Sequence, residues 1–371
     1  MALQTQVLDN PAAFEQLRAC WDGLVLKNSG PILGHDATSS FAWFEALLAA
    51  FSNAKDTKIV VVLQGTEIVA LLPVVAENTQ AGCRRLFVPT VLYGGRNGFL
   101  LSRPSAELLT ALLGGIQKAF GRWQSLRMWL VDQSESGLLL RQTCASAGYQ
   151  VVSEPGGLSP HFPLHEDAQV FSAGMSKGLK QRLKAAPAKF SALGQLVYQE
   201  LRDETCSEAA MQAILAVDQG SWKQQAGTAI TCHPDQERFY RALFPRALRA
   251  GLLYGQILYL DEKPIAFSFG LVHAGVFSSL KHSQTTEFER LSPSHLLNAA
   301  MIDKLRAAGV ATFDFMGESE PHKLQWSDAT GFYQRQPVLI YSPLLCGRIG
   351  FAIHEIKRLA LRTWKSRKPK A

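Results

Sequence analysis

The chain has 371 residues, of which 47% are hydrophobic and 19% are charged, and its formal net charge is +7. This length exceeds that of one ordinary hydrophobic core, so two domains are expected, and the composition excludes a largely disordered protein. The six cysteines form no CxxC pair and no Cys/His metal spacing, so no metal site is expected.

The positive charge is concentrated at the C-terminal end, where residues 348–371 hold eight Lys or Arg and a single acid, Glu355. Such a tail is either a solvated basic segment or a contact for anionic lipid or nucleic acid. Little net charge remains without it, which argues against nucleic acid as the main partner. The first residues lack a signal-peptide pattern, and no run of eighteen apolar residues occurs. We therefore expect a cytoplasmic protein whose tail is a candidate contact to the inner face of the membrane.

Strands and helices alternate in the first half of the chain. Two β-rich runs flank Gln64-Gly65-Thr66, which is the pattern of a hairpin. The Gly- and Pro-rich segment 153–160 holds the densest group of residues that end helices and strands, and it is interpreted as part of the domain junction. The predicted elements are a hairpin at 58–75, a strand at 86–93, a helix at 105–120, a strand at 126–131 and a helix at 138–147.

The second half repeats this order of elements. Pro187 lies inside its first helix and is expected to kink or break it. Because the order hairpin, strand, helix, strand occurs in both halves, we expect a structural duplication. The expected domains are 1–165, 166–345 and a basic helical tail at 346–371. The predicted elements are an amphipathic basic helix at 176–193, helices at 207–222 and 237–250, a hairpin at 253–271, a strand at 276–283, a helix at 293–308 and a strand at 311–316.

The most informative segment is 309–326, which is interpreted as a buried strand that ends in an acidic turn. Asp314 lies between Phe313 and Phe315, so in a strand its side chain points away from both. Burial of a carboxyl group disfavours its charged form, which suits a general base; equally, this carboxylate could accept a hydrogen bond from a neighbouring amide. Three side chains that could bind a substrate follow the turn, namely His322, Lys323 and Trp326.

Several segments of the second half resemble the GNAT acyltransferase fold, and in particular the CelD or BcsL subgroup associated with cellulose and exopolysaccharide loci. The matching segments are 176–184, Ser221-Trp222-Lys223, 255–267 and 313–326. The first half resembles the partner domain of such tandem proteins by the order of its elements and by Trp21, Phe41, Trp43 and Phe44. FemAB-type peptidoglycan aminoacyl transferases share this layout. The resemblance implies an α/β fold of tandem GNAT-like domains, each a mixed central sheet flanked by helices.

A GNAT-like enzyme moves an acyl group from coenzyme A to an amine or a hydroxyl. The resemblance implies that acyl-CoA contacts the start of the 293–308 helix, at Ser292, Ser294 and His295. The Gly-rich phosphate loop of the family is absent, and Ser292 with Pro293 is equally explained by helix capping. The candidate catalytic residues are Asp314, Glu318 and His282, and the candidate acceptor-binding residues are Lys180, Trp222, His322, Lys323 and Trp326. A structural or solvent-exposed role is the alternative for each of them.

Three functions are compatible with these patterns. The first is an acyl-CoA-dependent N- or O-acyltransferase that acts on a saccharide or lipid-linked precursor of the cell envelope or of an exopolysaccharide. The second is a FemAB-like transferase that uses aminoacyl-tRNA, and the third is a non-catalytic GNAT-fold scaffold in polysaccharide biosynthesis. The missing Gly-rich loop favours the third, and the absence of a large basic patch argues against the second.

Overall fold

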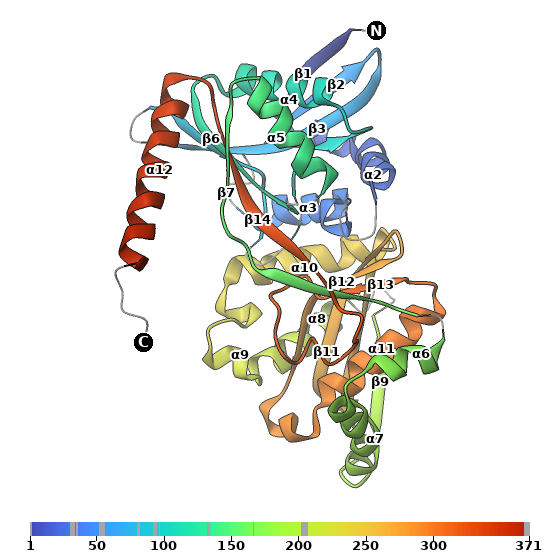
Figure 1. Cartoon of the computed structure of the whole chain (residues 1–371). Helices are drawn as coiled ribbons and strands as arrows, with labels where there is room; N and C mark the ends of the chain where they lie inside the picture. Colours follow the sequence, from blue (N-terminus) through green and yellow to red (C-terminus); the bar gives the residue numbers. More distant parts are fainter. Residues whose placement is uncertain are drawn as a thin grey trace.

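The computed structural model describes residues 2–29, 34, 36–51, 56–79, 82–91, 95, 97–131, 134–165, 167–201 and 207–366, with side chains described up to residue 360. Within these ranges the chain folds into two lobes that follow one another along the long axis of the molecule (Figure 1). One continuous sheet of fourteen strands runs through both lobes in the order β1-β2-β3-β4-β6-β14-β8-β13-β12-β11-β10-β9, with β5 beside β3 and β7 beside β14.

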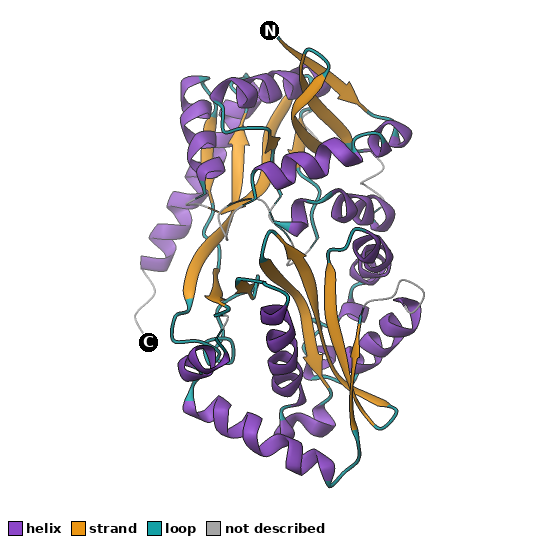
Figure 2. Cartoon of the chain, turned by 90° about the vertical axis from the view of Figure 1, so that its right-hand side faces the viewer, coloured by secondary structure: helices purple, strands orange, loops and turns teal. Residues whose placement is uncertain are grey.

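The N-terminal half packs helices on both faces of its part of the sheet (Figure 2). Along the strand Lys58–Gln64, Val60 and Val62 pack in the cluster that includes helix Ala106–Phe120, whereas Ile59 and Val61 pack in the cluster that includes Trp21. This alternation is the period of two that a strand imposes. The elements are β1 (Leu3–Leu8), α1 (Pro11–Glu15), α2 (Arg18–Lys27), α3 (Phe41–Ala50), β2 (Lys58–Gln64), β3 (Glu67–Asn78), β4 (Arg84–Phe87), β5 (Leu100–Leu101), α4 (Ala106–Phe120), β6 (Trp123–Val131), α5 (Glu135–Ser146) and β7 (Gln150–Ser153).

The C-terminal half has the same layered arrangement. Its helices α8 and α10 cover one face of the sheet, and α7 and α11 cover the other. Pro187 does not break its helix, because α7 continues through it to Ser191. The elements are β8 (Leu158–Pro163), α6 (Ala168–Gly174), α7 (Lys177–Ser191), β9 (Leu196–Glu200), α8 (Ser207–Gln219), α9 (Trp222–Gln225), α10 (Pro234–Arg249), β10 (Leu253–Leu260), β11 (Lys263–His273), β12 (Val276–Gln284), a 3-10 helix (Thr286–Leu291), α11 (Pro293–Ala307), β13 (Thr312–Asp314), β14 (Gly331–Tyr341) and α12 (Leu345–Ser366).

The two halves repeat one topology, as the sequence predicts. In each half three strands pair in antiparallel fashion, a helix follows, and the next strand returns parallel to the third. The series is β2, β3, β4, α4 and β6 in the first half and β10, β11, β12, α11 and β13 in the second. The mixed sheet flanked by helices agrees with the fold class expected from the sequence.

The halves share strand β14 at their junction. β8 lies within the first expected domain, 1–165, but pairs with β13 of the C-terminal half, and β14 pairs with β8 through Gly331–Gln334 and then with β6 through Arg335–Tyr341. Figure 1 shows β14 running from one lobe into the other. The loop that precedes β8 lies so close to β14 that a Cβ atom at Gly156 would be 1.7 Å from the carbonyl oxygen of Arg335. The segment 153–160 is therefore part of the junction, and β14 contributes to the sheet of both halves.

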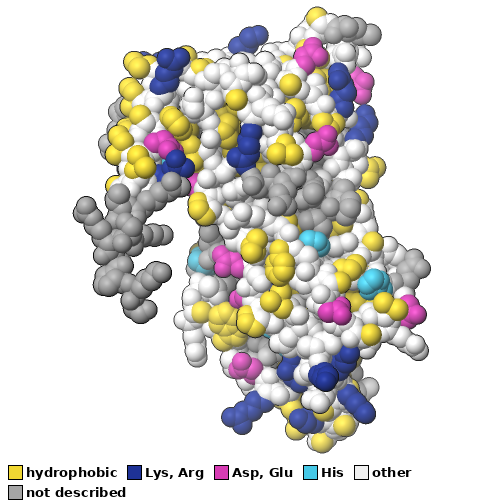
Figure 3. All heavy atoms as spheres, in the orientation of Figure 1, with side chains coloured by type: hydrophobic (Ala, Val, Ile, Leu, Met, Phe, Trp, Pro, Cys, Tyr) yellow, Lys and Arg dark blue, Asp and Glu magenta, His cyan; other side chains and the backbone are white. Residues whose placement is uncertain are grey.

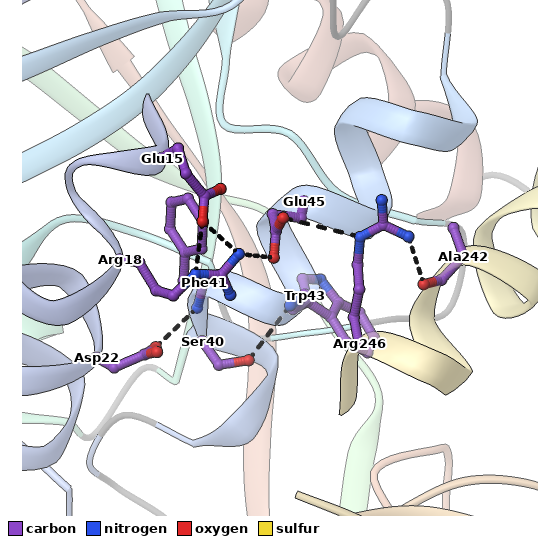
Figure 4. A network of polar contacts seen from close by, with 9 residues as sticks. All are labelled: Glu15, Arg18, Asp22, Ser40, Phe41, Trp43, Glu45, Ala242 and Arg246. Atoms are coloured by element: carbon purple, nitrogen blue, oxygen red, sulfur yellow. Dashed lines mark hydrogen bonds and ion pairs between the residues drawn. The ribbon is translucent and has the colours of Figure 1, made fainter. Parts of the chain in front are cut away.

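Helices α3 and α10 join the halves on another side of the sheet. Trp43 of α3 meets Phe239 of α10 edge to face, with ring centroids 4.8 Å apart. Glu45 lies between Arg18, at 2.8 Å, and Arg246, at 3.9 Å (Figure 4). These ion pairs are partly exposed and contribute at most about 1 kcal/mol each, so the apolar contacts between the helices supply most of the stability of the junction.

Candidate functional site

Strands β12 and β13 separate soon after they meet. They pair in parallel only between Val276–Ser278 and Thr312–Asp314, although β12 continues to Gln284. A bulge in the pairing of β12 with β11 lies within the part of β12 that continues. Bulges often occur beside active sites because they redirect a strand. The region between residues 279–284 and 315–326, where the two segments are no longer paired, is called the wedge below.

A constrained turn directs the chain away from β12. Met316 has a left-handed backbone with φ of 57°, and the Gly317 amide donates to the Phe315 carbonyl at 2.5 Å, so the turn is a γ-turn that is strained for a residue with a side chain. The fully buried Asp314 carboxylate accepts from the Met316 amide at 2.8 Å and from the Tyr333 hydroxyl at 2.9 and 3.0 Å. The position of Asp314 thus agrees with its predicted role as an amide acceptor. Its role as a general base stays a prediction.

The corresponding gap in the N-terminal half is bridged by Asn97. Strands β4 and β6 are also parallel and also separate, but the backbone of Asn97 exchanges hydrogen bonds of 3.2 and 3.3 Å with Trp129 of β6. The Asn97 side-chain amide donates to the Pro89 carbonyl at 2.7 Å on the other side of the gap. Among the described residues, no isolated bridge of this kind crosses the wedge of the C-terminal half.

Three histidines lie at the wedge, and their rings make two contacts, one between two histidines and one with a tryptophan. His282 lies near the end of β12, and its ring centroid is 5.8 Å from that of His322, which follows the γ-turn. His295 of α11 stacks on the buried Trp326, with centroids 6.0 Å apart and an interplanar angle of 19°. The Nδ1 atom of His295 is buried and has no hydrogen-bond partner among the described residues. The structure thus brings four predicted site residues together, from three separate segments.

Two lysines complete this group. Lys223 of α9 donates through Nζ to the carbonyl oxygen of His282. Lys323 is buried, donates to the Glu318 carbonyl at 2.6 Å and lies 3.3 Å from the Glu320 carboxylate, which is itself 3.7 Å from His322. His282, His295, His322, Lys223 and Lys323 are called the basic cluster below.

Burial lowers the pKa of every histidine in the basic cluster. The pKa of His282 lies well below its ordinary value because the ring is desolvated and because the charges of Lys223 and Lys323 disfavour its protonated form. Burial, with Arg182 and His322 nearby, lowers the pKa of His295 to about 4, and burial outweighs Glu320 in lowering the pKa of His322. Burial also lowers the pKa of Lys223 to about 8. At neutral pH these rings are therefore uncharged and able to accept a proton.

A cavity of about 1310 Å³ adjoins the basic cluster. It extends over β4, β6, β14 and α12, and the residues that it shares with the γ-turn segment include Glu318, Glu320 and Lys323. Trp129 lies in its wall, with the guanidinium carbons of Arg127 and Arg335 at 5.8 and 5.9 Å from the ring centroid. Arg side chains beside an aromatic ring can bind an anionic group and a flat or ring-shaped ligand together.

The predicted capping role of Ser292 is wrong. Ser292 has a left-handed backbone with φ of 54° and makes no side-chain capping bond. Gln284 caps α11 instead, since its Oε1 atom accepts from the Ser294 amide at 3.0 Å and from the Ser294 hydroxyl at 2.7 Å. The amides of His295 and Leu296 donate to the Ser292 carbonyl at 3.0 and 3.4 Å. The first amides of α11 are therefore already partnered within the chain.

The remaining predicted residues are Lys180, Trp222 and Glu318. Lys180 donates to the Ala173 carbonyl at 2.8 Å, and Trp222 is 53% exposed on α9. A Cβ atom at Gly157 would be 2.9 Å from the side chain of Glu318, in the cavity wall. Several residues that the fold places here are not among the candidate site residues, namely Arg182, Lys223, Gln284, Trp129 and Tyr333. Arg182 and Lys223 do lie in segments that carry the family resemblance. Among the described residues no group of His, Cys, Asp or Glu could hold a metal ion.

Comparison with known families assigns the half of the chain that carries the wedge. Residues 177–324 match the family model described as an acetyltransferase (GNAT) domain. Over these residues the C-terminal half is similar to a GNAT domain. This range includes the wedge and the whole basic cluster. No match was found among curated protein sequences.

Solved structures share the fold of the whole chain. The crystal structure of FemX superposes with a TM-score of 0.63, at 10% identity, over 92% of this chain and 97% of that one. A tandem GNAT protein from the clavulanic acid biosynthesis pathway gives 0.52, at 13% identity, over 92% and 98%. L-PGS from Bacillus licheniformis gives 0.51, at 12% identity, over 95% and 97%. At these identities the likeness concerns the fold.

Proposed function

We propose that the protein is an acyl-CoA-dependent N- or O-acyltransferase that acts on a precursor of the cell envelope or of an exopolysaccharide. The observation that carries the proposal is the wedge in the GNAT domain, which is lined by uncharged histidines and adjoins the cavity through residues 317–323. A donor in the wedge and an acceptor in the cavity would meet at this segment.

The proposed reaction uses the basic cluster. The acyl thioester lies along residues 279–284 of β12, where the backbone is not paired with β13. His322 accepts the proton of the acceptor amine or hydroxyl, whose nitrogen or oxygen then bonds to the acyl carbon, and the carbon–sulfur bond breaks to release the thiol. Lys223 and Lys323 are the nearest cations of the basic cluster for the developing negative charge on oxygen. A positioned general base contributes about 10²- to 10⁴-fold to such a rate.

The acceptor is proposed to bind along Trp129. A sugar ring can pack on the indole, and Arg127 or Arg335 can pair with a phosphate or carboxylate. This chemistry suits a phosphorylated or acidic saccharide precursor, as in the CelD or BcsL subgroup that the sequence resembles. Cellulose or exopolysaccharide biosynthesis is the corresponding proposed pathway class.

The test is a calorimetric titration of the full chain with acetyl-CoA and with a longer acyl-CoA. We expect saturable binding of at least one of them. In a separate assay of thioester hydrolysis or transfer, His322→Gln should lower the rate by about 10²-fold without changing donor affinity. The matched control is His165→Gln, an exposed histidine outside the basic cluster. If no acyl-CoA binds, the proposal is wrong.

One observation favours a second candidate, a FemAB-like transferase that uses aminoacyl-tRNA. Because Gln284 and Ser292 already pair the first amides of α11, a coenzyme A pyrophosphate must displace the Gln284 side chain to bind there. An aminoacyl donor has no such pyrophosphate. This candidate predicts binding of charged tRNA that weakens steeply with salt and no binding of acyl-CoA. A non-catalytic scaffold instead predicts that neither donor binds.

A further inference from the structure

Helix α12 packs on the N-terminal half through one narrow face. Cβ atoms at Gly347 and Gly350 would be 2.1 Å from the Ser342 carbonyl oxygen and 2.6 Å from the Gln124 side chain, so both glycines allow close contact. Tyr341 of β14 meets Phe351 edge to face at 5.8 Å, and its hydroxyl is 2.9 Å from Nδ1 of His354. These contacts fix the orientation of the helix.

The opposite face of α12 is apolar and exposed. Leu345, Ile349, Ile353 and Ile356 are 72%, 50%, 47% and 66% exposed. Their spacing of four, four and three residues puts them on one stripe of a helix. Large apolar side chains gathered on one exposed stripe indicate an interaction surface. In Figure 3 hydrophobic side chains gather at the edge of the molecule where Figure 1 shows α12.

Basic residues border this stripe. At about 100° per residue, Arg348 and Lys357 lie on its two sides, and both are exposed. Arg358 pairs with Glu355, which is the single acid against eight Lys or Arg in residues 348–371. An apolar stripe between basic side chains is the arrangement of a helix that lies in the surface of an anionic membrane, with the apolar groups among the acyl chains and the cations at the headgroups.

We propose that α12 binds the surface of an anionic lipid bilayer. The positive charge of α12 favours an anionic bilayer over a second copy of the chain as the partner. Two copies joined through this stripe would bring two strongly basic segments together, whereas an anionic bilayer attracts each basic residue. No helix in the described part of the chain is long and apolar enough to cross a membrane, so α12 lies on the bilayer.

The bound bilayer would lie beside the cavity. Ile353 of the stripe, His354 and Lys357 also line the cavity. A lipid-linked acceptor could therefore enter the cavity along α12 without leaving the membrane. This last step rests on the proposed transferase function, whereas membrane binding itself does not.

The experiment is co-flotation of the full chain with vesicles of phosphatidylcholine alone and of phosphatidylcholine with phosphatidylglycerol. We expect flotation with the anionic vesicles, and at least a tenfold loss of bound protein both for Ile349→Glu/Ile356→Glu and for Arg348→Gln/Lys357→Gln. The matched control, Val170→Glu/Leu193→Glu, changes two equally exposed apolar residues away from α12 and should float like the unaltered chain.

Three results would overturn the proposal. The first is no binding to anionic vesicles by the unaltered chain, and the second is equal loss in the control variant. The third is a dimer in sedimentation that Ile349→Glu/Ile356→Glu dissociates while vesicle binding is absent, which would make a second copy the partner. Titration with acetyl-CoA distinguishes a failure of membrane binding from a failure of the proposed function. Because α12 lies outside the residues that match the GNAT family, its variants should bind acyl-CoA normally.

Discussion

The pH dependence of stability tests the electrostatics of the basic cluster, and His295 gives the clearest prediction. Its folded-state pKa is about 4, against an ordinary value of 6.5. Between these values the unfolded chain binds the proton and the folded chain does not. Stability from this group is therefore complete above pH 6.5 and decreases as the pH falls toward 4. At pH 5 the pH lies about 1.5 units below the ordinary pKa but still above the folded-state pKa. Stability is therefore lower by about 2 kcal/mol than at neutral pH.

His295→Gln should remove this part of the pH dependence. Urea unfolding at pH 7.5 and pH 5.0 gives the loss for each variant, so a change in stability common to both pH values cancels. We expect the loss on acidification to be about 2 kcal/mol smaller in His295→Gln than in the unaltered chain. His273, His282 and His322, whose pKa values are also lowered, contribute to the loss that remains. His165→Gln is the control and should show the full loss. An undiminished loss in His295→Gln would refute the reasoning.

Three further predictions concern the turn, the junction and the cavity. Tyr333→Phe removes the hydroxyl that donates to the buried Asp314 carboxylate, so the free energy of unfolding should fall by about 1.5–3 kcal/mol; an unchanged value in urea unfolding would contradict this role. Gly156→Ala should prevent recovery of soluble folded protein because its Cβ atom overlaps the backbone of β14, whereas Gly114→Ala, on the exposed face of α4, should raise stability by about 0.5–1 kcal/mol. A soluble and equally stable Gly156→Ala protein would argue against the close crossing. Trp129→Ala should raise the KM for the acceptor about tenfold and leave acyl-CoA affinity unchanged; a change in the donor affinity alone would place the donor in the cavity.

Local sequence patterns predicted most of the secondary structure. The hairpins, the helix at 105–120 and the strand around Asp314 follow from hydrophobic spacing and from glycines at helix ends, and the structure confirms them. Ser292 shows the limit of such patterns. A Ser before a Pro predicts a helix cap, but Ser292 has a left-handed backbone and its side chain makes no capping hydrogen bond. Gln284 of β12 caps the helix instead.

Local sequence patterns do not predict which distant strands pair with one another. Nothing in the composition of residues 331–341 indicates that one strand completes both halves of the sheet, since such pairing depends on chain segments far apart. The same holds for the basic cluster. His282, His295 and His322 are each candidates on the sequence alone, but their proximity to Lys223 follows only from the separation of β12 and β13.

Hydrogen exchange of the full chain, with and without acetyl-CoA, tests most directly the claim that the donor lies in the wedge. If the account is correct, acetyl-CoA slows exchange of the amides of residues 279–284 and leaves residues 84–88, at the bridged gap of the N-terminal half, unchanged. Protection at residues 84–88, or no protection in β12 under saturating acetyl-CoA, would contradict the account.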